Sequence, residues 1–191
     1  MILEVVRYGH PTLRKKGERI ETVTPAIKKL IADMFETMYA YKGVGLAAQQ
    51  VGQALQLTVL DVRAVTDRPS SLELKGEPAD VNDFMPLVLI NPQLTLIGES
   101  APGGEGCLSF PEIYAEISRA VSTDVKALNG KGKPVEFRCS GLLARAIQHE
   151  ADHLNGVLFI DRMNKETKAE LKPLLDELQT STKAELRNRA S

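Results

Sequence analysis

Tryptophan is absent from this chain of 191 residues, which also contains only two cysteines and three histidines. Two cysteines are too few for the disulfide framework of a small secreted protein, so Cys107 and Cys139 are available for other chemistry. No apolar run approaches the roughly 20 residues that span a bilayer. The first residues lack the basic-then-apolar layout of a signal peptide. We therefore expect a cytoplasmic protein with no membrane partner.

Neither sign of charge is in excess. Lys and Arg number 24 against 25 for Asp and Glu, which gives a net charge of −1. This balance gives no electrostatic reason to expect DNA or an anionic membrane as a partner. Hydrophobic residues make up 43% of the chain, enough for one core at this length. We expect residues 1–191 to form a single domain.

The spacing of apolar residues predicts a helix near the N-terminus, followed by strands. Residues 25–41 have the i, i+3, i+4 spacing of one helical face, with Thr24 as the N-cap and Pro25 in the first turn. Residues 129–132 have the sequence of a tight turn between two strands. Strands are expected at residues 57–62, 87–90, 93–97, 113–128 and 135–139.

The last third of the chain returns to a helical period. Residues 141–155 predict a helix, and residues 164–191 predict a C-terminal helix and tail, kinked or divided at Pro173. Residues 66–86 are polar and predict a surface insertion. Because helices and strands do not alternate, we expect an α+β fold. Mostly antiparallel β-sheets would surround a central helix, with the other two helices at the N-terminal and C-terminal ends.

The predicted central helix carries the sequence HEADH at residues 149–153. Residues four apart share a helical face, so His149 and His153 can bind one metal ion with Glu150 beside them as a general base. A catalytic site of this kind generally needs a third protein ligand. His10, the two cysteines and many carboxylates are available for it, and the spacing does not choose among them.

Two glycine-containing segments have either a functional or a structural interpretation. Cys107 follows Gly106, with Gly103 and Gly104 just before. Glycines allow the backbone to approach a site closely, but a free cysteine is also commonly a small buried hydrophobe. Cys139, at the end of an alternating strand, is the better candidate for that second role. Residues 43–52 combine glycines, small residues and side-chain amides, and could be a site loop or a tight packing turn.

Together these segments resemble the peptide deformylase family, whose motifs are G-φ-G-L-A-A-x-Q, E-G-C-L-S and H-E-x-D-H. Residues 43–50, 105–109 and 149–153 match them without a mismatch, and the similarity extends over most of residues 1–163. It implies a catalytic domain that hydrolyses the N-formyl group of the N-terminal formylmethionine of new proteins and releases formate. Residues 66–86 depart from the family pattern, as does Tyr114, where many members have a substrate-contacting arginine.

The resemblance also implies one divalent metal ion per chain, bound by Cys107, His149 and His153. Fe(II) is the expected ion, with Zn, Ni or Co as replacements. Glu150 would take a proton from water and later deliver it to the departing amine.

Further roles follow from the same resemblance. The Leu108 backbone N–H and the Gln50 side-chain amide would stabilise the oxyanion of the reaction. Arg119 would pair with Asp152 behind the metal ligands. The residues expected to contact the N-formylmethionyl peptide are Val44, Gly45, Glu105, Gly106, Leu142 and Ala146.

The mildly basic end of the chain could be a solvated tail, but the family resemblance suggests a contact with the ribosome, where the substrate emerges. The basic residues there are Lys183, Arg187 and Arg189.

Two other functions remain open. A zincin-type peptidase would take its third ligand downstream of His153, where Glu166 and Glu170 are available. A structural metal module, or a degenerate homologue without activity, would have no need for Glu150 or Gln50.

Overall fold

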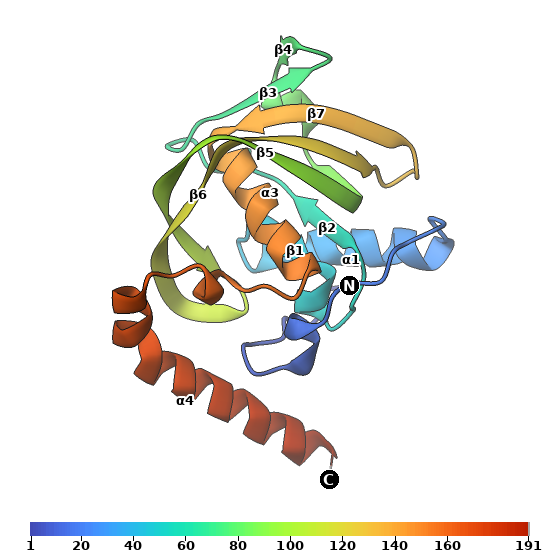
Figure 1. Ribbon diagram of the computed structural model, residues 1–191. Helices are drawn as coiled ribbons and strands as arrows, with labels where there is room; N and C mark the ends of the chain where they lie inside the picture. Colours follow the sequence, from blue (N-terminus) through green and yellow to red (C-terminus); the bar gives the residue numbers. More distant parts are fainter. Residues whose placement is uncertain (191) are drawn as a thin grey trace.

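The computed structural model describes residues 1–190, and its strands form one sheet (Figure 1). The strands are β1 (Gly45–Ala47), β2 (Leu57–Leu60), β3 (Ser70–Leu74), β4 (Glu77–Ala79), β5 (Leu87–Cys107), β6 (Phe110–Leu128) and β7 (Pro134–Ser140). Their order is β1-β2-β5-β6-β7-β3-β4, and all neighbouring pairs are antiparallel. The expected α+β class with antiparallel pairing is therefore confirmed, as one connected sheet.

The helices are α1 (Pro25–Ala40), α2 (Val81–Phe84), α3 (Gly141–Leu154) and α4 (Lys165–Ala190), with 3-10 turns η1 (Pro11–Arg14), η2 (Ala48–Val51) and η3 (Phe159–Asp161). The predicted cap of α1 is present, since the Thr24 hydroxyl accepts a hydrogen bond from the Ile27 N–H at 3.3 Å. Among the described residues, no helix combines the length and the apolar character needed to cross a membrane.

Strand β5 is longer than the sequence indicates. The prediction of separate strands at residues 87–90 and 93–97 is wrong, because β5 continues through Asn91 and Pro92 with an irregular register between Ile90 and Gln93. Asn91 adopts a φ of 52°, a conformation that asparagine tolerates better than most residues. Its side chain also accepts from the Ile20 N–H at 2.9 Å and donates to the Ile20 carbonyl at 2.7 Å.

Residues 66–86 and the C-terminal helix have more regular structure than their sequences indicate. Residues 66–86 contain β3, β4 and α2, and β3 pairs with β7 to extend the sheet. Helix α4 continues through Pro173 and is not divided there. Figure 1 shows its first part set at an angle to the remainder, as expected where proline removes a backbone hydrogen bond.

Helix α3 packs against the sheet and contacts β1, β2, β6 and β7 (Figure 1). Its apolar side chains, such as Leu143, Ala144 and Ile147, are almost fully buried. The imidazoles of His149 and His153 contact residues at the end of β5. Packing of the apolar stripe thus fixes the rotation of α3 and directs its polar residues to one place.

Candidate metal centre

Three side chains converge where β5 ends against α3. The ligand atoms of Cys107, His149 and His153 all lie within 4.8 Å of one another, and Cys107 Sγ is 3.3 Å from His153 Nε2. Among residues 1–190 this is the one group of three or more His, Cys, Asp and Glu side chains close enough to share an ion. His10 therefore does not join the two helical histidines.

The donor set fits a divalent transition metal. A thiolate with two imidazoles suits iron, zinc, nickel or cobalt. His149 uses Nδ1 in a 3.0 Å hydrogen bond with Glu105 Oε2, which leaves Nε2 available as a ligand atom. A carboxylate on the second ring nitrogen is a common feature of metal-binding histidines, because it fixes the ring orientation.

The two histidines titrate differently in the metal-free chain. Burial would lower the pKa of His149, but hydrogen bonds with Cys107 and Glu105 outweigh it and raise that pKa to about 10. Burial lowers the pKa of His153 well below its usual value, and the nearby charges of His149 and Arg119 lower it further. His153 therefore presents a neutral ring, the form that binds metals.

Glu150 is buried beside these three side chains, and its carboxyl group interacts with the side chain of Thr58. One carboxylate oxygen, Oε2, has no hydrogen-bond partner, while the other lies so close to Gly45 that a Cβ there would come within 2.5 Å. Burial raises the pKa of Glu150 to about 7, although the charges of His149 and Arg119 act in the opposite direction. A carboxyl with this pKa can both accept and return a proton near neutral pH.

The Gln50 side chain is oriented toward the sulfur of Cys107. Gln50 Oε1 accepts from the Ala47 N–H at 2.9 Å, so Nε2 faces the other way. Nε2 lies 3.5 Å from Cys107 Sγ and donates to Ser109 Oγ at 3.3 Å. An amide N–H donor, the group expected there from the sequence, is thus held next to the candidate metal ligands.

A cavity of about 590 Å³ opens onto the group. Its lining includes most residues expected from the sequence: Val44, Gly45, Gln50, Glu105, Gly106, Cys107, Leu108, Leu142, Ala146, His149 and Glu150. The rim also contains residues that the sequence did not single out: Tyr41, Lys42, Arg68 and Glu112. Tyr114 is 72% exposed there, and its ring lies against Gly106.

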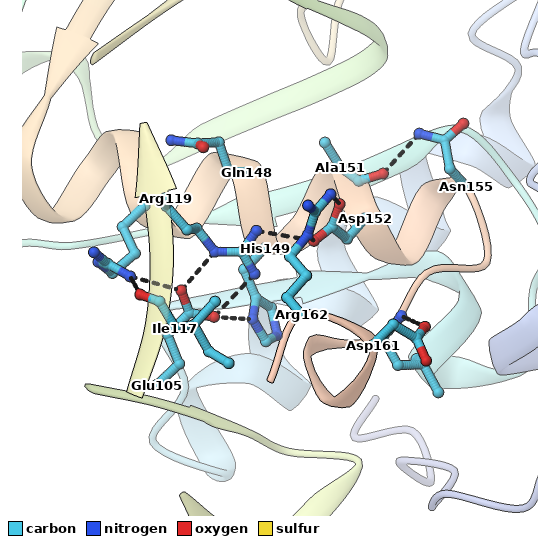
Figure 2. Close-up of polar contacts among 12 residues, drawn as sticks. Glu105, Ile117, Arg119, Gln148, His149, Ala151, Asp152, Asn155, Asp161 and Arg162 are labelled. Atoms are coloured by element: carbon cyan, nitrogen blue, oxygen red, sulfur yellow. Dashed lines mark hydrogen bonds and ion pairs between the residues drawn. The ribbon is translucent and has the colours of Figure 1, made fainter. Parts of the chain in front are cut away.

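Glu105, at the wall of the cavity, is the centre of a buried ion-pair network (Figure 2). Arg119 donates to it twice, from Nε at 2.5 Å and from Nη2 at 2.9 Å, and Arg145 donates at 3.0 Å. Burial opposes ionisation of Glu105, but the hydrogen bonds from His149 and Arg119 outweigh it and lower its pKa to about 2. The carboxylate expected to contact the substrate peptide is therefore occupied by neighbours within the protein.

The hydrogen bond between Arg119 and Asp152 is present at 2.8 Å. Two arginines of the network were not found from the sequence. Arg145 could have been noticed, because it is a charged residue that interrupts the apolar run at residues 142–147. It donates to the carbonyls of Ala101 at 2.8 Å and Ile117 at 2.7 Å. Arg162, which contacts Asp152, lies directly after the 3-10 turn η3. No pattern in the sequence points to it.

The chain is similar to known proteins over most of its length. The family model described as polypeptide deformylase matches residues 2–169. The chain is 47% identical to a peptide deformylase of Methylacidiphilum infernorum over 179 residues, 94% of each chain. It is 42% identical to one of Opitutus terrae over 186 residues, 96% of each.

Solved structures give the same result. A peptide deformylase from Legionella pneumophila superposes with a TM-score of 0.78 at 35% identity, covering 94% of this chain and 96% of that one. Peptide deformylase 1B from Arabidopsis thaliana, solved in complex with an inhibitor, superposes with a TM-score of 0.82 at 36% identity, covering 96% and 93%. By both sequence and fold, the chain belongs to the peptide deformylase family.

Proposed function

We propose that this chain hydrolyses the N-formyl group of N-formylmethionyl nascent peptides with one divalent metal ion held by Cys107, His149 and His153. The observation that carries the proposal is the convergence of one thiol and two imidazoles beside a buried carboxyl group, with Cys107, His149 and Glu150 lining one cavity. The ion, expected to be Fe(II) with Zn, Ni or Co as replacements, would supply Lewis acidity and make water a nucleophile at neutral pH.

The protein's own groups would handle the proton and the developing charge. Glu150 takes one proton from the attacking water and returns it to the amine nitrogen as the formyl C–N bond breaks, so that formate and a free amino terminus result. Gln50 Nε2 and the Leu108 backbone N–H donate to the oxyanion that forms on the formyl oxygen.

The cavity suits an extended peptide that begins with methionine. Backbone groups of Val44, Gly45 and Gly106 would pair with the peptide as an added strand does. Leu142 and Ala146 offer an apolar lining to the methionine side chain, whose flexible thioether adapts to such a surface.

The two alternative functions are less consistent with these contacts. Glu166 and Glu170 lie on α4 and are not part of the ligand group, so the third ligand of a zincin-type peptidase is missing from the described residues. A structural metal site is usually closed by four protein ligands, whereas this group has three and lies at a cavity.

Formate release from formyl-Met-Ala-Ser tests the proposal, either anaerobically with Fe(II) or with Ni(II). We expect activity in the wild type and none in Glu150→Ala, while Cys107→Ala should lose both the metal and activity. A wild type inactive with both metals would overturn the assignment. A Cys107→Ala variant that keeps its metal and cleaves internal peptide bonds would indicate a peptidase.

We also propose that α4 contacts the ribosome through its exposed side. Its other side is already engaged, since Arg189 donates to Glu4 at 2.8 and 2.9 Å and Arg7 donates to Glu185 at 2.5 and 2.6 Å. Lys183 is exposed and is available for the phosphate backbone. Lys183→Glu should weaken co-sedimentation with ribosomes without changing activity on a short formyl peptide, and unchanged co-sedimentation would dispose of the idea.

A further inference from the structure

Arg162 lies just after η3, at a second cavity that shares no lining residue with the first. This cavity has a volume of about 360 Å³, and Arg119, Asp152 and Arg162 are among its lining residues. The Arg162 side chain is 46% exposed, whereas that of Asp152 is only 11% exposed. The ion-pair network behind His149 therefore reaches the surface at Arg162.

Arg162 makes a two-pronged contact with Asp152 (Figure 2). Its Nε lies 2.5 Å from Oδ2 and its Nη2 lies 2.6 Å from Oδ1. Asp152 Oδ2 also accepts from Arg119 Nη1 at 2.8 Å. Two parallel bonds between a guanidinium and a carboxylate form the strongest and most directional type of side-chain ion pair.

Arg119 is shared between two buried carboxylates. It gives two hydrogen bonds to Glu105 and one to Asp152. A buried carboxylate must have its charge and lone pairs satisfied. Arg119 serves both acids at once, with Nε and Nη2 on Glu105 and Nη1 on Asp152, so a shift of its guanidinium toward Asp152 would weaken its bonds to Glu105. Arg162 satisfies both oxygens of Asp152 and leaves Arg119 free to bind Glu105 with two bonds.

We propose that Arg162 is a positioning residue for His149, acting through Asp152, Arg119 and Glu105. This inference rests on the proposed function, in which His149 is a metal ligand. Glu105 holds Nδ1 of His149 at 3.0 Å, and that bond sets the direction in which the opposite nitrogen points. The position of Glu105 is fixed in turn by its two bonds from Arg119, together with one from Arg145.

The turn that carries Arg162 is itself well fixed. The Arg162 N–H donates to the Phe159 carbonyl at 3.1 Å. Asp161 accepts from Arg14 at 2.5 and 3.1 Å and from the Leu158 N–H at 2.9 Å. The Phe159 ring lies 6.0 Å from the ring of His149. Arg162 therefore starts from a rigid backbone, as a positioning role requires.

Arg162→Leu should therefore affect metal binding at a distance. Without Arg162, Asp152 Oδ1 loses its only hydrogen-bond donor among the described contacts, and Arg119 is drawn away from Glu105 toward Asp152. We expect metal affinity to fall by up to about tenfold, the lower end of the effect of removing a group that orients metal ligands. Arg162→Lys, which cannot form the two-pronged pair, should give an intermediate loss.

Removing the charge of Asp152 as well should restore the metal affinity that Arg162→Leu loses. In Arg162→Leu/Asp152→Asn, the remaining amide attracts Arg119 less than a carboxylate does, so Arg119 should stay on Glu105. The double variant should bind metal more tightly than Arg162→Leu alone. If Arg162 only supported the fold, the double variant should bind metal more weakly than Arg162→Leu alone, because each substitution would then lower the affinity further.

The experiment measures Co(II) and Zn(II) affinity by competition with a chromogenic chelator, the visible spectrum of the Co(II) form, and thermal unfolding of the metal-free protein. Arg138→Leu is the matched control, because Arg138 forms the same kind of pair with Asp124, at 2.8 and 3.0 Å, on an exposed part of β6 and β7.

A lower affinity and an altered Co(II) spectrum in Arg162→Leu but not in Arg138→Leu, with recovery in the double variant, would support the inference. Equal metal affinity in wild type and Arg162→Leu, or no recovery in the double variant, would overturn it. A wild type that binds neither ion would instead refute the proposed function, on which this inference depends.

Discussion

Replacing Glu150 by glutamine should make the metal-free protein more stable at alkaline pH. Glu150 is only 4% exposed, and its Oε2 has no hydrogen-bond partner. Burial raises its pKa from 4.5 to about 7, so the folded chain holds the proton more tightly than the unfolded chain does. Glutamine has the shape of the protonated acid but carries no charge at any pH, and it removes the cost of ionising this side chain.

The size of the effect follows from the two pKa values. A carboxyl group whose pKa is higher in the folded state costs nothing below pH 4.5, and the cost grows from there up to pH 7. Above pH 7 the loss of unfolding free energy no longer grows. It amounts to about 1.4 kcal/mol for each pH unit between 4.5 and 7, or about 3 kcal/mol in total. The gain in unfolding free energy from Glu150→Gln should therefore be about 2–3 kcal/mol larger at pH 8.5 than at pH 5.

Urea unfolding followed by circular dichroism measures this gain, since the chain has no tryptophan to report by fluorescence. The metal is removed first with a chelator, because an ion beside Glu150 would change its ionisation. Glu116→Gln is the control, since Glu116 is exposed on β6, and its effect should be small and nearly the same at the two pH values. A gain from Glu150→Gln that does not change between pH 5 and pH 8.5 would refute the reasoning.

Three further predictions concern single contacts. Gly45→Ala should lower kcat in a folded protein, because its Cβ would lie 2.5 Å from Glu150 Oε1; a normal kcat on formyl-Met-Ala-Ser would contradict this. Gln50→Leu should lower kcat by about 10²–10³-fold with a smaller change in KM, whereas an equal rise in KM alone would assign Gln50 to ground-state binding. Phe110→Ala should cost about 3–5 kcal/mol in urea unfolding, because Phe110 is 1% exposed and packs on Tyr8 and Phe159; a cost below about 1 kcal/mol would be inconsistent with that packing.

Local patterns were sufficient for α1, α3 and α4, but they missed α2, β1, β3 and β4 and the continuity of β5. The start of α1 and the length of α3 follow from cap residues and a 3.6-residue period, which depend only on neighbours in sequence. Asn91-Pro92 usually marks a break, so the strand was expected to end there. In the structure a side chain from that break bonds to Ile20, 71 residues earlier, and no local pattern contains such a contact.

The candidate site shows the same division. Cys107 could be joined to the two histidines only through the family resemblance, because the sequence spacing left His10 and the carboxylates equally available. Glu105 was expected at the substrate, and its bonds to Arg119 and Arg145 became visible only when β5, β6 and α3 were brought together. Partnerships between distant side chains depend on the tertiary structure, which sequence periodicity does not encode.

The tertiary structure gives two buried glutamates, Glu105 and Glu150, opposite pKa shifts. Glu105 and Glu150 are both near His149, and burial alone would raise the pKa of each. Hydrogen bonds from His149 and Arg119 nevertheless lower the pKa of Glu105 to about 2, whereas the sparsely bonded Glu150 keeps a pKa of about 7. Glu105 therefore stays charged and holds a ring in place at any physiological pH. Glu150 is left free to exchange a proton, and carboxyl groups separated in this way are the ones that divide between structural and acid–base roles.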